Sequence, residues 1–359
     1  MNYAVVMAGG KGERFWPLSR AGSPKQFLKI LSDKTLLEET LERTAALAPL
    51  ERTLVVAAEA FKKQILEKVP SLSGKNLLLE PEGKNTAPAI ALAAVHLAQT
   101  DPRAVMIVLP SDHFIEPKER LSRILSAAAE RAQEGDFLIT LGIVPTRAET
   151  GYGYIEVGEK TNETDGIALY KVARFKEKPN RTAAQEYYLD RKHFWNSGMF
   201  VWSAAAILKA FERHQPKMYK QLKTYSEAIG TSKEEEGRKK LFAALEPVSV
   251  DVAVLEKADN VLTIPSDFTW DDVGSFLALE RVRKRDRENN LCLGSSLALS
   301  SYETTVINEG EGVVAVFGVS DLVVVKSGDS VLVAHKTRVA DLKELTEKLA
   351  SDPKYKPYL

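Results

Sequence analysis

The sequence has very little cysteine, since Cys292 is the single thiol in 359 residues. One cysteine cannot form an internal disulfide, and no pair of cysteines has the spacing of a zinc site. The five histidines also lack the spacing of metal ligands. The composition therefore excludes a disulfide-stabilised domain and predicts a reducing compartment, the cytoplasm.

An excess of charge is also absent, because 49 lysines and arginines balance 49 acidic residues. Nucleic-acid binding depends on clustered cations that neutralise phosphates, so we expect no nucleic-acid partner. The longest uncharged stretch, residues 85–99, contains polar side chains and a proline and is shorter than the ~20 apolar residues that span a bilayer. The short apolar run at the amino terminus leads into glycines and charges, unlike a signal peptide, and we expect no membrane partner.

The chain does contain short aliphatic runs that alternate with longer segments of helical period. This alternation builds a mostly parallel sheet with helices on both faces, so the predicted fold class is α/β with a doubly wound sheet. We predict strands at 3–7, 53–57, 76–80, 104–109 and 137–143, and helices at 35–47, 59–69, 87–98 and 121–133.

The pattern changes after residue 150 and again after residue 290. We expect a hairpin (152–157 and 167–175), a strand (198–202) and charged helices up to about residue 246 as insertions in the first domain. Short strands at 304–307, 313–317, 322–325 and 331–334 then predict a small all-β domain. A helix at 337–349 follows, with Val339, Leu342, Leu345 and Leu349 on one stripe. The predicted domains are 1–288 and 289–359.

Loops that leave the carboxyl ends of strands are the expected ligand sites of such a sheet. The first strand leads into Gly9, Gly10 and Gly12, with Arg14 and Lys25 nearby. Glycines let backbone N–H groups approach an anion, so we interpret this loop as a phosphate cradle, although a tight turn would also need glycine. No Walker motif or dinucleotide fingerprint is present.

Two acidic positions could hold a metal ion. Asp112 follows a buried strand, and Asp271 and Asp272 form a pair before a later helix. A carboxylate in such a place commonly holds Mg²⁺ with a nucleotide phosphate, and helix capping is the alternative for both positions. We predict that Asp112 pairs with one carboxylate of the later pair.

Three further motifs are weak when taken singly. The run FKEKP (175–179) is typical of a solvated strand end, and NSGMF (196–200) and GYGY (151–154) could be structural turns. No nucleophile elbow or catalytic cysteine context is present, so hydrolase functions lose support.

Taken in order, AGGKGERFWPLSR, SPKQF, GKNTAPAI, LPSDH, GYGYIE, FKEKP, NSGMF and WDDVGSF resemble the sugar-nucleotidyltransferases, and in detail the mannose-1-phosphate guanylyltransferases. The resemblance covers nearly the whole chain. The WPLSR and NTAP segments distinguish this branch from the glucose-1-phosphate relatives. The resemblance implies a Rossmann-like catalytic domain at 1–288 and a small β-helix-like domain at 289–359, often used for dimerisation, so a homodimer is expected.

The resemblance also implies individual roles for matching residues. Arg14, Lys25 and Lys178 would be catalytic, and Asp112 and Asp272 would bind Mg²⁺, the expected cofactor. The nucleotide would contact Ala8, Gly9, Gly10, Gly12, Arg14, Lys25, Asn85, Thr86, Pro88 and Ser111. The sugar phosphate would contact Gly153, Glu177, Lys178 and Asn196.

The implied reaction transfers GMP from GTP to α-D-mannose 1-phosphate and gives GDP-mannose and pyrophosphate. Cations are needed because each close pair of like charges costs ~4 kcal/mol at an effective dielectric near 20. Phe15, Lys176, Asp271 and Phe276 depart from the family pattern, and Asp271 leaves the second metal ligand ambiguous. Longer relatives carry a fused phosphomannose isomerase domain that is not expected here. Another nucleotide and sugar (dTTP with glucose 1-phosphate), a non-catalytic GDP-mannose-binding paralogue, and a nucleotide-binding scaffold stay open as alternatives.

Overall fold

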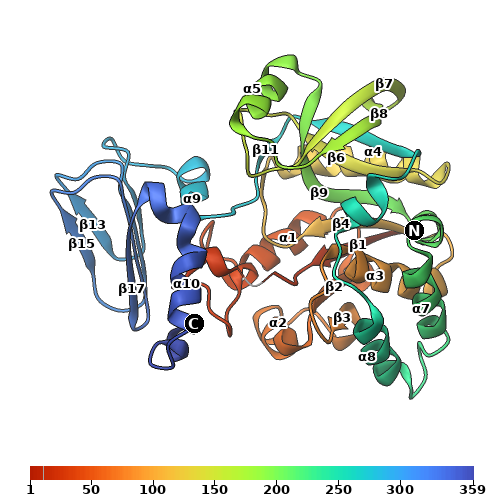
Figure 1. Cartoon of the computed structure of the whole chain (residues 1–359), viewed down its shortest axis with the longest axis horizontal. Helices are drawn as coiled ribbons and strands as arrows, with labels where there is room; N and C mark the ends of the chain where they lie inside the picture. The colour runs from red at the N-terminus through yellow and green to blue at the C-terminus, as the bar shows by residue number, and fades with distance from the viewer. Residues whose placement is uncertain (11) are drawn as a thin grey trace. The chain divides into compact units, whose positions relative to one another are not determined.

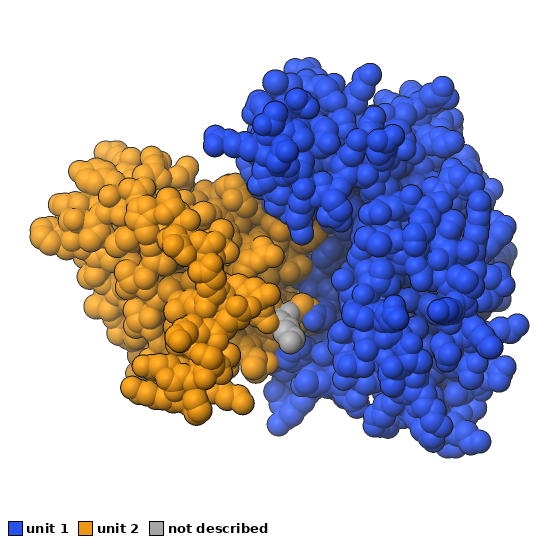
Figure 2. All heavy atoms as spheres, in the orientation of Figure 1, with its two compact units in different colours: residues 1–9, 40–111, 115–270 blue, residues 10–39, 112–114, 271–359 orange. Residues whose placement is uncertain are grey.

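The computed structural model describes residues 1–10 and 12–359 and divides the chain into two compact units. Unit 1 comprises residues 1–9, 40–111 and 115–270, and unit 2 comprises residues 10–39, 112–114 and 271–359 (Figure 2). The units therefore do not follow the predicted boundary after residue 288, which stays a prediction. The chain passes between the units at several junctions, and three of them lie in motifs singled out above: Gly9–Gly10, Ser111–Asp112 and Trp270–Asp271.

Unit 1 is built on a nine-stranded sheet of order β3-β2-β1-β4-β9-β6-β10-β8-β7 (Figure 1). Neighbouring strands are parallel from β3 to β4 and between β6 and β10, whereas β9 runs antiparallel to both β4 and β6. The sheet is therefore mixed, because β9 inserts between strands of the doubly wound core. The strands are β1 (Asn2–Met7), β2 (Thr53–Ala58), β3 (Leu77–Glu80), β4 (Val105–Pro110), β6 (Leu138–Ile143), β7 (Tyr154–Thr164), β8 (Ile167–Lys176), β9 (His193–Ser203) and β10 (Val261–Ser266).

Helices follow the strands in the predicted α/β alternation, which confirms the fold class. They are α1 (Leu36–Thr44), α2 (Lys62–Lys68), α3 (Thr86–Thr100), α4 (Lys118–Gln133), α5 (Arg181–Asp190), α6 (Ala204–His214), α7 (Pro216–Ser226) and α8 (Glu234–Ala244). A single π-helical turn, η6 (Asp251–Leu255), precedes β10, and β5 (Phe114–Glu116) pairs with β11 (Thr269–Asp271) outside the main sheet.

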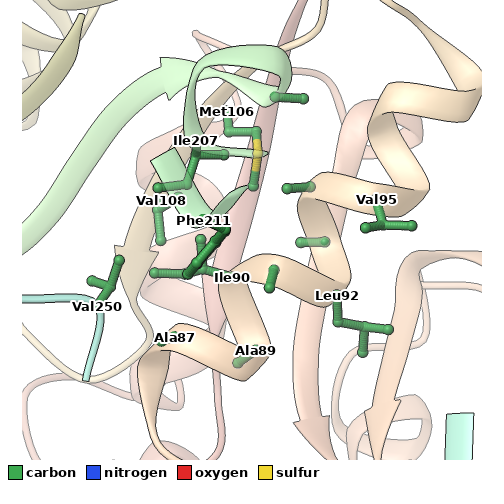
Figure 3. Close-up of a cluster of buried hydrophobic side chains, with 14 of the residues drawn as sticks. Ala87, Ala89, Ile90, Leu92, Val95, Met106, Val108, Ile207, Phe211 and Val250 are labelled. Carbon is green, nitrogen blue, oxygen red and sulfur yellow. The ribbon is translucent and has the colours of Figure 1, made fainter. Parts of the chain in front are cut away.

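The helix α3 is largely buried and packs against β1, β2 and β3 of the sheet. Its alanines allow close packing, and Figure 3 shows Ile90 of α3, Val108 of β4 and Phe211 of α6 in one cluster of buried side chains. Burial of such a side chain contributes ~1.5–3 kcal/mol relative to exposure. The amino end of α3 is capped by Asn85, whose Oδ1 accepts from the Thr86 N–H at 2.8 Å.

Unit 2 contains the small β domain and the segments of the chain that pack with it. Its strands are β12 (Leu291–Leu293), β13 (Ser296–Leu299), β14 (Thr305–Glu309), β15 (Val314–Phe317), β16 (Leu322–Ser327) and β17 (Ser330–His335). Parallel pairs β12–β14–β16 and β13–β15 form two separate ladders, as expected of a β-helix-like domain. Unit 2 also contains the helix α9 (Phe276–Val282) and two short 3₁₀ turns, η1 (Glu13–Phe15) and η2 (Lys25–Phe27). The candidate residues Arg14 and Lys25 lie in these two turns.

One expectation for the carboxyl-terminal region is wrong. Instead of one helix at 337–349, the chain forms a 3₁₀ segment, η7 (Lys336–Asp341), followed by α10 (Leu342–Ala350). The predicted apolar stripe is split by this change of helical period. Val339 and Leu342 are buried, but Leu345 is 37% exposed. No described helix combines the length and the apolar character that a membrane span requires.

Candidate active site

A cavity of about 480 Å³ in unit 2 brings together residues from motifs far apart in the sequence. The cavity is lined by five parts of the chain: the loop at residues 10–15, the loop at Lys25, the segment after β4, the segment after β11 and the start of α10. The lining residues are Gly10, Gly12, Glu13, Arg14, Phe15, Lys25, Asp112, His113, Asp272, Gly274 and Lys343. The predicted residues Gly10, Gly12, Arg14, Lys25, Asp112 and Asp272 therefore share one cavity. Lys11, in the same motif, lies outside the described residues.

Gly12 has a clear steric reason to be glycine. Its φ is 68°, and a Cβ added there would lie 2.5 Å from Cβ and 2.7 Å from the backbone N of Lys25. No atom lies within 4 Å of a Cβ added at Gly10. The tight-turn interpretation thus applies to Gly12, where glycine also allows Lys25 to approach the loop, whereas Gly10 lines the cavity without this constraint.

Lys25 is buried and contacts two acidic residues of the cavity. Its Nζ donates to Oδ2 of Asp112 at 2.7 Å and to the backbone oxygen of Asp272 at 2.6 Å. Burial alone would raise the pKa of Asp112, but the positive charges of Lys25 and His113 outweigh burial and hold the pKa below its ordinary value. Asp112 is therefore ionised at neutral pH.

The two adjacent acids of the WDDVG motif have different surroundings. Asp271 is buried and accepts from Arg281 Nε at 2.6 Å, whereas Asp272 lines the cavity and its Oδ1 accepts from the Gly274 N–H at 3.0 Å. Val273, which follows Asp272, has a φ of 46°, an unusual conformation for a β-branched residue. The Val273 N–H donates to Oδ1 of Asp271 at 2.9 Å, so Asp271 supports the strained turn that follows Asp272.

The oxygen donors of this cavity match the preference of Mg²⁺ for carboxylates, water and phosphate. Asp112 and Asp272 both line the cavity, and Lys25 Nζ contacts the carboxylate of Asp112 and the backbone oxygen of Asp272. Among the described residues, no group of three His, Cys, Asp or Glu side chains is placed to hold a metal. Two carboxylates that share an ion with substrate phosphates are compatible with this arrangement.

The predicted sugar-phosphate residues lie in unit 1, where three strands meet. The Asn196 N–H donates to the Gly153 carbonyl at 2.9 Å, and a Cβ at Gly153 would contact Asn196 and the Lys176 carbonyl. Glu177 and Lys178 follow directly at the exposed end of β8. The structure therefore brings Gly153 and Asn196 together beside the end of the strand that leads to Lys178.

Sequence analysis missed Asp251 in this group. The Asn196 Nδ2 donates to Oδ1 of Asp251 at 2.7 Å, and the Gly198 N–H donates to Oδ1 of Asn196 at 3.3 Å. Burial raises the pKa of Asp251, and the negative charge of Glu177 adds to this increase, although the hydrogen bond from Asn196 opposes it. Asp251 begins the π-helical turn η6, a feature that is frequent at functional sites but has no clear signal in a single sequence.

Several residues of unit 1 that are predicted to contact the nucleotide have structural partners. The Thr86 Oγ1 accepts from the Val250 N–H at 2.9 Å, the Ser111 N–H donates to the Met7 carbonyl at 3.1 Å, and the Ala8 N–H donates to the Val56 carbonyl at 2.7 Å. Asn85 caps α3, as described above, and Pro88 is buried within the same helix. Contact of these residues with the nucleotide stays a prediction.

Glu80, at the end of β3, is a second residue that sequence analysis missed. It is 4% exposed, and burial raises its pKa to about 7. Its Oε1 has no hydrogen-bond partner among the described residues, and Oε2 lies 3.1 Å from a Cβ added at Gly9. A buried carboxyl with an unused acceptor beside a candidate glycine loop is a candidate ligand-binding group.

Two family models match this chain. A nucleotidyl transferase model covers residues 3–289, and a MannoseP isomerase/GMP-like beta-helix domain model covers residues 298–349. The chain belongs to the nucleotidyl transferase family. Enzymes of this family generally use a divalent metal ion.

Similar proteins agree with this membership in the nucleotidyl transferase family. A mannose-1-phosphate guanylyltransferase of Escherichia coli (strain K12) is 36% identical over 98% of this chain and 74% of that protein. A Vibrio cholerae protein named as a putative mannose-1-phosphate guanylyltransferase is also 36% identical, over 97% of this chain and 74% of its own length. A crystal structure described as mannose-1-phosphate geranyltransferase from Thermus thermophilus is 40% identical, with a TM-score of 0.86 over 97% of this chain and 99% of that chain.

Proposed function

We propose that the protein transfers GMP from GTP to α-D-mannose 1-phosphate, giving GDP-mannose and pyrophosphate. The cavity that gathers Gly10, Arg14, Lys25 and Asp112 is the observation that carries this proposal. A triphosphate carries about four negative charges, and these repel one another strongly at short range unless cations such as Arg14 and Lys25 offset them. The names of the similar nucleotidyl transferases support the choice of guanine and mannose.

The nucleophile in this reaction is already an anion, so the protein needs no general base. We assign Arg14 and Lys25 to the triphosphate, and Lys178 to the phosphate of the sugar. An oxygen of the sugar phosphate attacks the α-phosphorus in line, and the bond from that phosphorus to the β-phosphate oxygen breaks. Glu177, Asn196 and the Gly153 backbone orient the sugar hydroxyls. The cations of the protein offset the charge that collects on the leaving pyrophosphate.

The proposed cofactor is Mg²⁺, held by Asp112 and Asp272. Bound there, it would supply positive charge that polarises the phosphoryl oxygens. Asp271 is the less suitable ligand because Arg281 and the Val273 N–H already bind its carboxylate.

The chemistry of Glu80 favours guanine as the base. A carboxylate can accept hydrogen bonds from N1–H and from the 2-amino group of guanine at the same time. Glutamine at position 80 offers a single acceptor oxygen and a donor amide, and inosine lacks the 2-amino group. We therefore expect the wild-type protein to prefer GTP to ITP, and Glu80→Gln to lose most of this preference.

Pyrophosphate release tests the proposed function directly. The protein is incubated with Mg²⁺, one nucleoside triphosphate (GTP, ITP or dTTP) and one sugar phosphate (mannose or glucose 1-phosphate). We expect the fastest release with GTP and mannose 1-phosphate. Equal or faster release with dTTP and glucose 1-phosphate would refute the assignment, and the absence of release with every pair would favour a non-catalytic binding protein.

A homodimer through the small β domain is the proposed assembly, in a cytoplasmic setting. Leu299 and Phe317 are paired neighbours on β13 and β15 and are 57% and 73% exposed, and Leu297 is 55% exposed. Such an apolar group on one sheet face suits association with a second copy. Light scattering of the wild type and of Phe317→Ser tests it. We expect a dimer that the substitution weakens, and a monomeric wild type would contradict the proposal.

A further inference from the structure

Lys343 is the one residue of α10 that lines the cavity described above. It lies more than 300 residues along the chain from Gly12 and Arg14, yet all three line the same space in unit 2. No motif includes Lys343, and none of the functional assignments made above uses it. Its position makes the carboxyl-terminal helix part of the wall of the cavity.

The backbone around Lys343 is held firmly against the segment that contains Arg14. Leu342 is 3% exposed and belongs to the same buried cluster as Phe15 and Trp16. The Trp16 Nε1–H also donates to the Tyr358 carbonyl at 2.8 Å, beyond the end of α10. These contacts hold α10 against the segment that contains Arg14, so the main chain at Lys343 is already ordered beside the cavity.

The ammonium of Lys343 is weakly engaged by the protein itself. It forms an ion pair with Glu347 at 3.7 Å, and both side chains are about two-thirds exposed, 66% and 67%. Exposed pairs of this kind contribute only ~0–1 kcal/mol. Lys25, in contrast, is buried and contacts Asp112 at 2.7 Å. Lys343 can therefore turn toward an anion in the cavity at little cost.

We propose that Lys343 binds the β- and γ-phosphates of the nucleoside triphosphate, and hence the pyrophosphate that leaves. The proposal rests on the proposed function for the identity of the substrate. When the bond between the α-phosphorus and the β-phosphate oxygen breaks, the electron pair goes to that oxygen, and Lys343 offsets the added charge. The small β domain thus supplies a phosphate-binding residue as well as a surface for association.

Comparison of GTP with GMP tests this assignment, because GMP lacks the two phosphates that Lys343 is proposed to bind. Isothermal titration of the full-length protein measures the affinity for GTP, GMP and pyrophosphate, each with Mg²⁺. We expect Lys343→Ala to weaken GTP and pyrophosphate binding about tenfold and Lys343→Glu to weaken it further, with GMP affinity unchanged. Lys348→Glu changes the charge of the same helix by the same amount but does not line the cavity, and we expect less than a twofold effect.

The outcomes separate this proposal from the proposed function. GTP binding by Lys343→Glu that equals wild-type binding would overturn the role of Lys343, even in an active enzyme. Equal losses for Lys343→Glu and Lys348→Glu would also overturn it, because the effect would then be general electrostatics of the helix. A wild-type protein that binds GTP more tightly than GMP but releases no pyrophosphate would contradict the proposed function, while the variants would still test Lys343. A wild-type protein that binds neither GTP nor pyrophosphate would contradict both.

Discussion

The carboxylate of Asp271 is bound by the guanidinium of Arg281 through two hydrogen bonds, from Nε at 2.6 Å and from a terminal nitrogen at 3.0 Å. Its Oδ1 also accepts from the Val273 N–H, and this hydrogen bond closes the turn in which Val273 has a positive φ. Asp271 therefore serves the fold, whereas Asp272 is the acid of the pair that lines the cavity.

This difference predicts distinct effects of two alanine substitutions. Asp271→Ala removes the buried carboxylate that binds Arg281 through two hydrogen bonds and supports the Val273 turn, so we expect a loss of about 2 kcal/mol in the free energy of unfolding. Asp272→Ala removes the hydrogen bond from the Gly274 N–H and is expected to cost less stability, about 1 kcal/mol, but to lower kcat/KM at least roughly hundredfold. Urea unfolding and steady-state kinetics measure the two effects. Asp271 would be the metal ligand if Asp271→Ala kept the stability and lost the activity.

The hydrogen bond between Asn196 and Asp251 gives a second prediction. Asp251→Ala removes the acceptor that fixes the Asn196 amide, so we expect the KM for mannose 1-phosphate to rise about tenfold with little change in the KM for GTP. Asp251→Asn keeps an acceptor oxygen at the same place and should restore most of the affinity. A purely structural role of Asp251 would instead change both KM values or leave both variants equally impaired.

Much of the fold follows from sequence patterns, because the strand and helix periods of the doubly wound core are local. The mixed direction of the sheet was not predictable in the same way, since β9 joins β4 and β6 through pairings distant in sequence. Glu80 and Lys343 also lacked a local signal. The state of Glu80 depends on burial by other segments, and the place of Lys343 depends on the packing of α10 beside residues near the amino terminus. Both are properties of the folded chain.

Lys178 distinguishes a functional strand end from a merely solvated one. It is exposed, and the structure gives its side chain no ion pair among the described residues. If Lys178 binds the sugar phosphate, Lys178→Ala raises the KM for mannose 1-phosphate roughly ten- to a hundredfold with the KM for GTP little altered. Lys160→Ala, an exposed lysine on β7 that pairs with Glu163, is the matched control and should leave both values unchanged. Unchanged sugar kinetics in Lys178→Ala would remove this residue from the site.

The buried carboxyl of Glu80 gives a prediction for stability as a function of pH. Burial raises its pKa from 4.5 to about 7, so the folded protein binds this proton more tightly than the unfolded chain. Stability associated with Glu80 is therefore fully present below pH 4.5 and falls as the pH rises toward 7. The shift corresponds to about 3 kcal/mol, because one pKa unit corresponds to about 1.4 kcal/mol. Glu80→Gln removes the ionisation and should be the more stable protein at pH 8 by an amount of this order.

The difference in free energy of unfolding between the wild type and Glu80→Gln isolates the titration of Glu80, because all other titrating groups are shared by the two proteins. Urea unfolding of wild type and Glu80→Gln at several pH values from 4.5 to 8 gives the difference in free energy of unfolding, which should grow steadily in favour of the variant. Glu82→Gln is the control, because Glu82 lies two residues further along the chain and its side chain is exposed. The difference in free energy of unfolding between this variant and the wild type should hardly depend on pH. A constant difference for Glu80→Gln would mean that Glu80 titrates near its ordinary pKa. GTP should reduce the difference at pH 8, because the ionised carboxylate then gains the guanine N–H groups as hydrogen-bond donors, and GMP, which carries the same base, should act in the same direction.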